Sequence, residues 1–300
     1  MSVLSLEGLL LTVACAVGWS LLDLTRKFLA GHASAVATAL LLVVGQIPLF
    51  VAWIVIEGDS FADLVPPAAY WPPGLATMAL NVLANLAFMQ SVKLSPISRT
   101  VPLLSLTPVF TTLVAIPILG EWPTGLQAVG IVVVVVASMV IARGASEGVE
   151  GGVLSTLTKR GGLLMAGVAL LWSITPNLDK LALEHAKAGV HALILVTGCA
   201  AALGVVAVVQ GRQAEVASLF RSRAALGLLA ASVLAAAFSI AVQFLAYEHV
   251  AVGFVETVKR GIGAAFALFA GRVFFAEHIG VGRLVAAGVM VAGVGLVIFG

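Results

Sequence analysis

The segment AVGFVETVKRGIGAAFALFAGRVFFAE, from Ala251 to Glu277, combines the length of a membrane-spanning helix with three charges in its first half. A helix rises about 1.5 Å per residue, so about 20 apolar residues cross the roughly 30 Å hydrocarbon core of a bilayer. A charged side chain near the centre of such a helix costs about 2.5–3.5 kcal/mol on insertion scales. We therefore expect Glu256, Lys259 and Arg260 to face a partner, a cavity or a ligand.

The composition of the whole chain indicates a membrane protein. Of its 300 residues, 61% are hydrophobic and only 10% are charged, and the mean hydropathy is +1.14. A soluble domain needs a more polar surface than this composition provides. The formal net charge of +2 gives no basis for nucleic-acid binding. We predict an integral, multi-pass protein of the cell inner (plasma) membrane.

Apolar runs recur along the chain and predict an all-α membrane protein with ten transmembrane helices. The expected spans are Leu6–Leu29, Ser34–Ile56, Trp71–Val92, Pro96–Leu119, Thr124–Ala142, Gly161–Leu183, Val190–Gln210, Ala224–Tyr247, Ala251–Phe275 and Ile279–Phe299. The longest break, residues 143–160, is charged and rich in glycine, which is typical of a linker. We therefore divide the chain into a first five-helix repeat (1–145), a linker (146–160) and a second five-helix repeat (161–300).

The two halves of the chain repeat each other. The matching pairs are Trp19 with Trp172, Lys27 with Lys180, Phe88 with Phe244, Phe110 with Phe266 and Glu121 with Glu277. Their spacing is nearly constant, as duplication followed by small loop changes would leave it. Because each half has an odd number of spans, the second half enters the membrane from the opposite side. Such inverted repeats are typical of carriers whose binding site lies near the midplane.

Three motifs carry a resemblance to a known family. Trp-Ser occurs in the first helix of each half, and the patterns SPISRTVPLLSLTPVFTTLVAIPILGE and AVGFVETVKRGIGAAFALFAGRVFFAE each precede a closing helix. With these motifs the chain resembles the EamA-type carriers of the drug/metabolite transporter superfamily over nearly its whole length. The resemblance implies ten helices that move small polar metabolites by alternating access.

The Lys259-Arg260 pair is also similar to the Lys-Arg pair with which plastid phosphate translocators of that superfamily hold the phosphate of their substrate. Those carriers place a further lysine in the fourth helix, near the position of Leu104 here. This chain departs from that pattern, since it carries Arg99 instead, more than one turn earlier.

The charges of the ninth expected helix suit an anion. Glu256 lies one turn before Lys259 and Arg260 and can neutralise only one of them. A guanidinium fork binds two oxygens of a carboxylate or phosphate, and a lysine adds a point charge. We expect Lys259 and Arg260 to hold the anion, Glu256 to orient them and Arg99 to be an auxiliary contact. The alternative is a purely structural ion pair.

Other polar and aromatic residues are expected to line the same site. Asn81 and Asn85 share one face of the third span and would offer hydrogen bonds, although packing between helices accounts for them equally well. Trp19 and Trp172 would form apolar walls, or they would simply pack.

We expect structural roles for two acidic residues, Asp23 and Glu121. Asp23 lies four residues before Lys27 and is expected to pair with it; the minority hypothesis is ion coupling, in which Asp23 exchanges protons with a gradient. Glu121 precedes a closing helix and is expected near the positive end of that helix dipole.

The sequence offers little basis for an enzyme. Its five histidines lack metal-ligand spacing, Cys15 and Cys199 lie inside apolar runs as packing residues, and no nucleophile elbow or Walker glycine loop is present. We therefore expect no catalytic residue, no cofactor and no metal.

Together these features predict a secondary active transporter that moves a small polar, anionic metabolite, bearing a carboxylate or phosphate, by alternating access. Its expected partners are this small-molecule substrate and the lipid bilayer, and the expected state is a monomer. The alternative within carriers is an amino-acid or drug exporter in which Glu256 and Asp23 bind an ammonium group. From other classes, a channel and a non-transporting membrane scaffold remain open.

Overall fold

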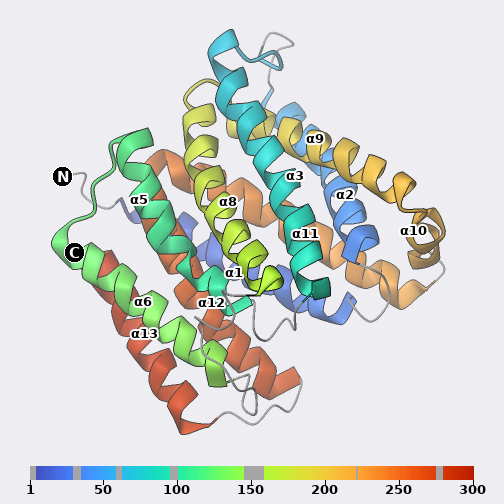
Figure 1. Cartoon of the computed structure of the whole chain (residues 1–300). Coiled ribbons are helices and arrows are strands. Elements are labelled where there is room, and N and C mark those ends of the chain that lie inside the picture. The colour runs from blue at the N-terminus through green and yellow to red at the C-terminus, as the bar shows by residue number, and fades with distance from the viewer. Residues whose placement is uncertain are drawn as a thin grey trace.

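The computed structural model describes residues 5–29, 35–58, 63–94, 101–144, 159–220, 222–274 and 280–300, and every regular element in these ranges is a helix (Figure 1). The first half contains α1 (Leu6–Leu29), α2 (Ala35–Glu57), η1 (Ala68–Tyr70), α3 (Trp71–Leu94), η2 (Val101–Leu106), α5 (Thr107–Leu119) and α6 (Gly125–Gly144). The second half contains α8 (Arg160–Leu183), α9 (Ala188–Val209), α10 (Gln213–Leu219), α11 (Arg223–His249), α12 (Val252–Phe274) and α13 (Val281–Phe299).

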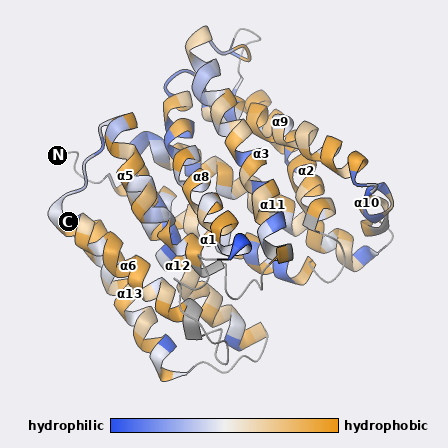
Figure 2. Cartoon of the chain, viewed as in Figure 1, coloured by the Kyte–Doolittle hydropathy of each residue, from blue (hydrophilic) through white to orange (hydrophobic). Residues whose placement is uncertain are grey.

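Six helices in the described part of the chain are long and apolar enough to cross a membrane, namely α1, α2, α8, α9, α11 and α13. Helices α3 and α12 have similar lengths, 24 and 23 residues. Apolar residues run along most of the helices (Figure 2), and many large ones are exposed, such as Leu234 and Val285. Water would disfavour so much exposed apolar surface, whereas lipid tails accommodate it.

The helices lie close to the spans expected from the sequence, and α1 has the expected bounds. The fourth span is the exception. Residues 95–100 fall outside the described residues, η2 is a 3₁₀ helix, and α5 begins only at Thr107 and has 13 residues. Pro102 and Pro108 have no backbone N–H for an α-helical ladder, which favours this break. The short helix α10 was not expected.

Helices of the two halves pack against each other. Helix α1 makes its most extensive contact with α11, and helix α8 makes its most extensive contact with α3. The last helices of the halves, α6 and α13, lie side by side, as do α2 and α9 (Figure 1). Helix α12 lies against both α1 and α5. The charged turn of α12 is therefore enclosed by helices from both halves.

The contact between α6 and α13 is close at Gly130. A Cβ atom at this position would lie 2.6 Å from Val297 Cγ2 and 2.7 Å from the carbonyl oxygen of Gly293. Small residues allow the backbones of membrane helices to approach in this way. Gly288, also on α13, has no atom within 4 Å of an added Cβ.

We predict that Gly130→Ala lowers the free energy of unfolding by about 1–3 kcal/mol, because the added methyl group has no space against the backbone of α13. Gly288→Ala is the matched control and should be neutral or stabilising by up to about 1 kcal/mol, since alanine favours a helix. Thermal unfolding in detergent measures both changes. Equal stability of the two variants would contradict the close contact.

Candidate substrate site

Helix α12 carries the three charges of its first half in an enclosed position. Glu256 is 2% exposed, and the side chain of Lys259 is 17% exposed. The Lys259 ammonium forms an ion pair with the Glu256 carboxylate one turn away. The pair removes both charges from direct contact with lipid, which is the condition for keeping them in a spanning helix.

Helix α11 supplies two residues that complete this cluster. The Tyr247 hydroxyl donates to Glu256 Oε1 at 3.0 Å and accepts a hydrogen bond from Gln243 Nε2 at 2.8 Å. Gln243 Oε1 accepts from Trp19 Nε1 of α1 at 2.7 Å and from Lys259 Nζ at 3.3 Å. Side chains of α1, α11 and α12 thus form one hydrogen-bonded set, the Glu256 network: Trp19, Gln243, Tyr247, Glu256 and Lys259.

The two tryptophans expected to line the site have different surroundings. Trp19 belongs to the Glu256 network through its indole N–H, and Lys259 Nζ also lies 5.4 Å from the centroid of its ring, within cation–π distance. Trp172 packs against Phe88 with ring centroids 5.7 Å apart. It belongs to a different apolar cluster, formed with buried residues such as Met165. The structure thus brings Trp19 to the charges of α12.

Arg260 and Asp23 lie at the more exposed side of the Glu256 network. Arg260 is partly exposed, and its Nε donor is buried without a hydrogen-bond partner among the described residues. The Asp23 carboxylate is exposed and feels the charges of Arg26, Arg260 and Lys259. Asp23 therefore lies within electrostatic range of the α12 cations, and the guanidinium group of Arg260 has hydrogen-bonding capacity that no described residue uses at Nε.

The other residues expected to contact the substrate are Asn81 and Asn85 on α3 and Arg99 before η2. Asn81 Nδ2 donates to the Thr77 carbonyl oxygen at 3.1 Å, and Asn85 Nδ2 donates to the Asn81 carbonyl oxygen at 2.7 Å. Both amides are partly buried and donate to the preceding turn of their own helix. Arg99 falls outside the described residues.

An ion pair joins the two halves at the N-terminal end of α12. Lys180 Nζ of α8 lies 2.7 Å from Glu121 Oε1 in the loop between α5 and α6, and it donates to the Val250 carbonyl oxygen at 2.9 Å. Glu121 Oε2 accepts the first N–H of α12, that of Val252, at 2.9 Å. We call these four residues the Glu121–Lys180 latch. It lies about one helical turn before Glu256 on α12.

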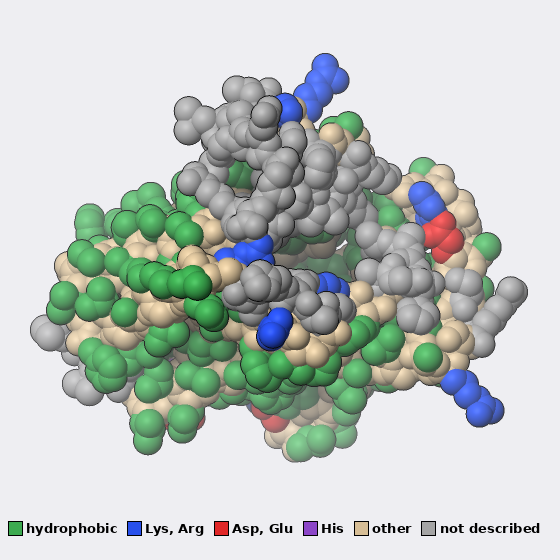
Figure 3. Space-filling view, turned by 90° about the horizontal axis from the view of Figure 1, so that it is seen from below, with side chains coloured by type: hydrophobic (Ala, Val, Ile, Leu, Met, Phe, Trp, Pro, Cys, Tyr) green, Lys and Arg blue, Asp and Glu red, His purple; other side chains and the backbone are tan. Residues whose placement is uncertain are grey.

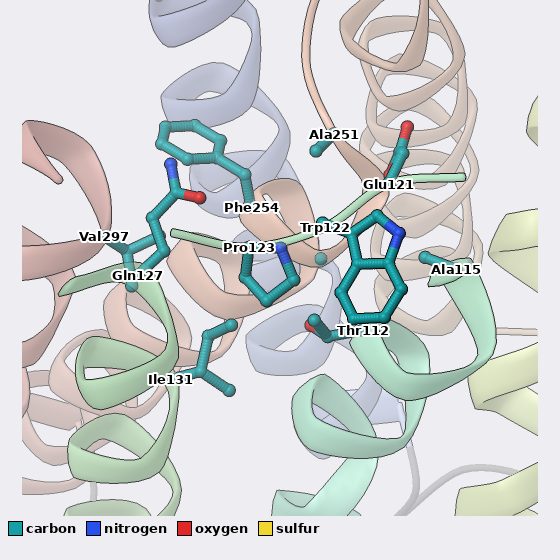
Figure 4. A pocket seen from close by; sticks show the side chains of 11 residues that line it. Thr112, Ala115, Glu121, Trp122, Pro123, Gln127, Ile131, Ala251, Phe254 and Val297 are labelled. Carbon is teal, nitrogen blue, oxygen red and sulfur yellow. The ribbon is translucent and has the colours of Figure 1, made fainter. Parts of the chain in front are cut away.

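Glu121 therefore acts differently from the sequence expectation. It was expected near the start of α6, the helix that follows it, but its carboxylate receives the N–H group that begins α12. Figure 4 shows Glu121 above a small pocket, with Trp122 and Phe254 around it. Because an acceptor at a helix N-terminus satisfies an otherwise unpaired donor, Glu121 stabilises the start of the helix that carries the site.

These observations define the class of protein. The apolar, exposed helices make the chain an integral, multi-pass membrane protein. Residues 6–143 match the sequence profile of the EamA-like transporter family. No curated protein matches the chain.

The fold is similar to solved structures. One protein crystal structure has a TM-score of 0.79 and 16% sequence identity, with 97% of this chain and 96% of that chain covered. At this identity the likeness shows the fold alone, and it extends over both halves of the chain.

We predict that the Glu121–Lys180 latch contributes to stability as a coupled unit. A double-mutant cycle of Glu121→Gln and Lys180→Met should give a coupling energy of about 1 kcal/mol or more, because each single change leaves a partly buried charge without its partner. Unfolding of the four proteins in detergent measures it. The pair Lys187 and Asp63, 4.0 Å apart and about half exposed, is the control, and its coupling should be below about 0.5 kcal/mol. Equal coupling in the two cycles would contradict a structural role for the latch.

Proposed function

We propose that this protein is a secondary active transporter that moves a small anionic metabolite by alternating access between two inverted five-helix repeats. The observation that carries the proposal is the enclosed cationic turn of α12, in which Arg260 Nε has no hydrogen-bond partner among the described residues, beside the Glu256–Lys259 ion pair. The match of residues 6–143 to EamA-like transporters supports the class.

The packing of the helices supports the inverted repeats. The first helix of each half, α1 or α8, packs against the third helix of the other half, α11 or α3. Each also packs against the fourth helix of the other half, and the two second and two fifth helices pair with each other. This reciprocal pattern is what a pseudo-two-fold axis in the membrane plane would produce.

The positive charges of Lys259 and Arg260 suit a substrate anion that competes with the Asp23 carboxylate for them. Asp23 is exposed and lies within electrostatic range of Arg260 and Lys259, so a carboxylate or phosphate of the substrate would meet the same cations and could bind the guanidinium group. The Glu256 network holds Lys259 from the side, through Gln243 Oε1 and the Trp19 ring. In this mechanism Lys259 and Arg260 bind the anion, and Glu256 fixes Lys259.

Access to this site is proposed from the face opposite the latch. Exposure rises from Glu256 through Lys259 to Asp23, away from the N-terminal end of α12. Figure 3 views the molecule from below and shows Lys and Arg side chains near the centre of that face. Exposed arginines at described helix ends, Arg26 and Arg160, would attract anions to it. Opening of the Glu121–Lys180 latch would then release the substrate on the other side.

One observation also favours an amino-acid exporter as a second candidate. Asp23 and Arg260 present opposite charges within electrostatic reach of each other. A zwitterion could pair its carboxylate with Arg260 and its ammonium group with Asp23. This candidate keeps the same fold and differs in the ligand.

A ligand panel tests the proposal. Purified protein in detergent is heated with inorganic phosphate, glycerol 3-phosphate, succinate, mixed amino acids or tetraphenylphosphonium. A ligand at about 100 times its Kd should add about 2.7 kcal/mol of apparent stability if it binds the folded state alone. We predict that anions stabilise the wild type and lose at least about tenfold in affinity in Arg260→Gln, because the guanidinium fork is removed.

Arg272→Gln is the matched control, since Arg272 is exposed near the end of the same helix and should not alter binding. Stabilisation by amino acids that is lost in both Arg260→Gln and Asp23→Asn would favour the second candidate. Counterflow in proteoliposomes separates a carrier from a channel or a scaffold. Stabilisation by tetraphenylphosphonium alone, unchanged in Arg260→Gln, would contradict an anion site at α12.

A further inference from the structure

A second buried polar chain lies between η1, α3, α8 and α9, separate from the Glu256 network. The Asp179 carboxylate accepts a hydrogen bond from Thr77 Oγ1 at 2.6 Å and contacts His191 Nε2 at 3.2 Å. The other ring nitrogen, His191 Nδ1, lies 2.9 Å from the Tyr70 hydroxyl. All four residues are at most 5% exposed. We call them the Asp179 relay.

The relay can hold two protonation states without moving its heavy atoms. With neutral His191, Nε2–H donates to Asp179, Nδ1 accepts from the Tyr70 hydroxyl, and the relay carries one negative charge. If one proton binds at Nδ1, the imidazolium donates from both nitrogens and the Tyr70 hydroxyl hydrogen rotates away. The relay is then neutral, which lowers the desolvation cost of the buried carboxylate.

The titratable groups around the relay do not occupy the proton-binding position at His191 Nδ1. Tyr70 faces His191 from η1, Cys199 faces Asp179 from α9, and Tyr247 feels Asp179 from α11. Burial, and to a smaller extent the Asp179 carboxylate, raise the pKa of Tyr70 above its ordinary value, so its phenol keeps its proton. Lys180, the next residue of α8, directs its ammonium group to Glu121.

The relay is connected to both parts of the proposed transport mechanism. The ring of Phe244 lies 4.8 Å from that of His191 and 6.4 Å from that of Tyr247, whose hydroxyl binds Glu256. Asp179 also directly precedes Lys180 of the latch. A change of charge at His191 is therefore separated from the Glu256 network by two ring contacts through Phe244, and Asp179 is adjacent in sequence to Lys180 of the latch.

We propose that Asp179 and His191 form the proton-binding site that couples transport to a pH gradient. This inference rests on the proposed function. One proton binds at His191 in one half of the transport cycle and leaves in the other, and Asp179 stabilises the imidazolium. A proton carried with the anion offsets part of its charge in the membrane interior. We thus assign proton coupling to the buried Asp179 relay and not to the exposed Asp23.

Proton flux in proteoliposomes tests the assignment. Vesicles that contain a pH-sensitive dye receive inorganic phosphate, glycerol 3-phosphate or succinate outside, and anion exchange is followed in parallel with radiolabelled compound. The wild type should change the internal pH as it moves the anion. Asp179→Asn/His191→Gln should still exchange the anion, with its pH signal reduced to that of protein-free vesicles. His185→Gln, in the turn after α8, is the matched histidine control and should behave as the wild type.

The outcomes separate this inference from the proposed function. Anion movement by the wild type without a pH change, or an unchanged pH signal in the double variant, overturns the proton site and leaves the transporter intact. Absence of anion movement by the wild type contradicts the proposed function and the inference with it. If the double variant does not fold, Tyr70→Phe provides the test, because it removes only the hydroxyl group that contacts His191 Nδ1. Its ratio of proton flux to anion exchange should fall, and an unchanged ratio would overturn the assignment.

Discussion

A charge inside a spanning helix must be paired, and the structure around α12 follows from that requirement. Glu256 and Lys259 neutralise each other within one turn. The pair still needs hydrogen-bond partners away from lipid, and Tyr247 and Gln243 of α11 provide them. Trp19 of α1 then binds the same glutamine. The α1–α11 contact, the most extensive between the described helices, thus includes a hydrogen bond that belongs to the polar cluster of α12.

The second half of the chain carries two buried acids, and neighbouring helices supply hydrogen-bond donors to each of them. Glu256 is held by α11 and its own helix, whereas Asp179 is held by Thr77 of α3 and His191 of α9. The latch joins the helices that carry these acids, because Lys180 follows Asp179 and Val252 begins the helix of Glu256. A change of charge at either acid can therefore bias one contact between the halves, which is what the proposed alternating access needs.

Most of the helices could be predicted from the sequence, because apolar runs of spanning length mark them. The bounds of α1 agree to the residue. The break between η2 and α5 was missed. Proline also occurs at the starts of uninterrupted helices, so Pro102 and Pro108 did not by themselves predict a break. In the candidate site, the charges of α12 were recognisable because charge is rare in apolar runs. Gln243 and Tyr247 were not, because single neutral polar residues in an apolar helix carry no pattern, and the Asp179–His191 contact depends on helix packing that spacing does not reveal.

The central claim is that the halves move relative to each other around the α12 site, and a distance across the latch tests it most directly. Spin labels at Trp122, which is 76% exposed, and at the exposed Glu184 would report the separation of the α5–α6 loop from the end of α8. The buried Cys15 and Cys199 would first be replaced by alanine. The account predicts two distance populations in lipid nanodiscs, whose ratio shifts when a stabilising anion is added. A single distance, unchanged with every ligand of the panel, would contradict alternating access at this latch.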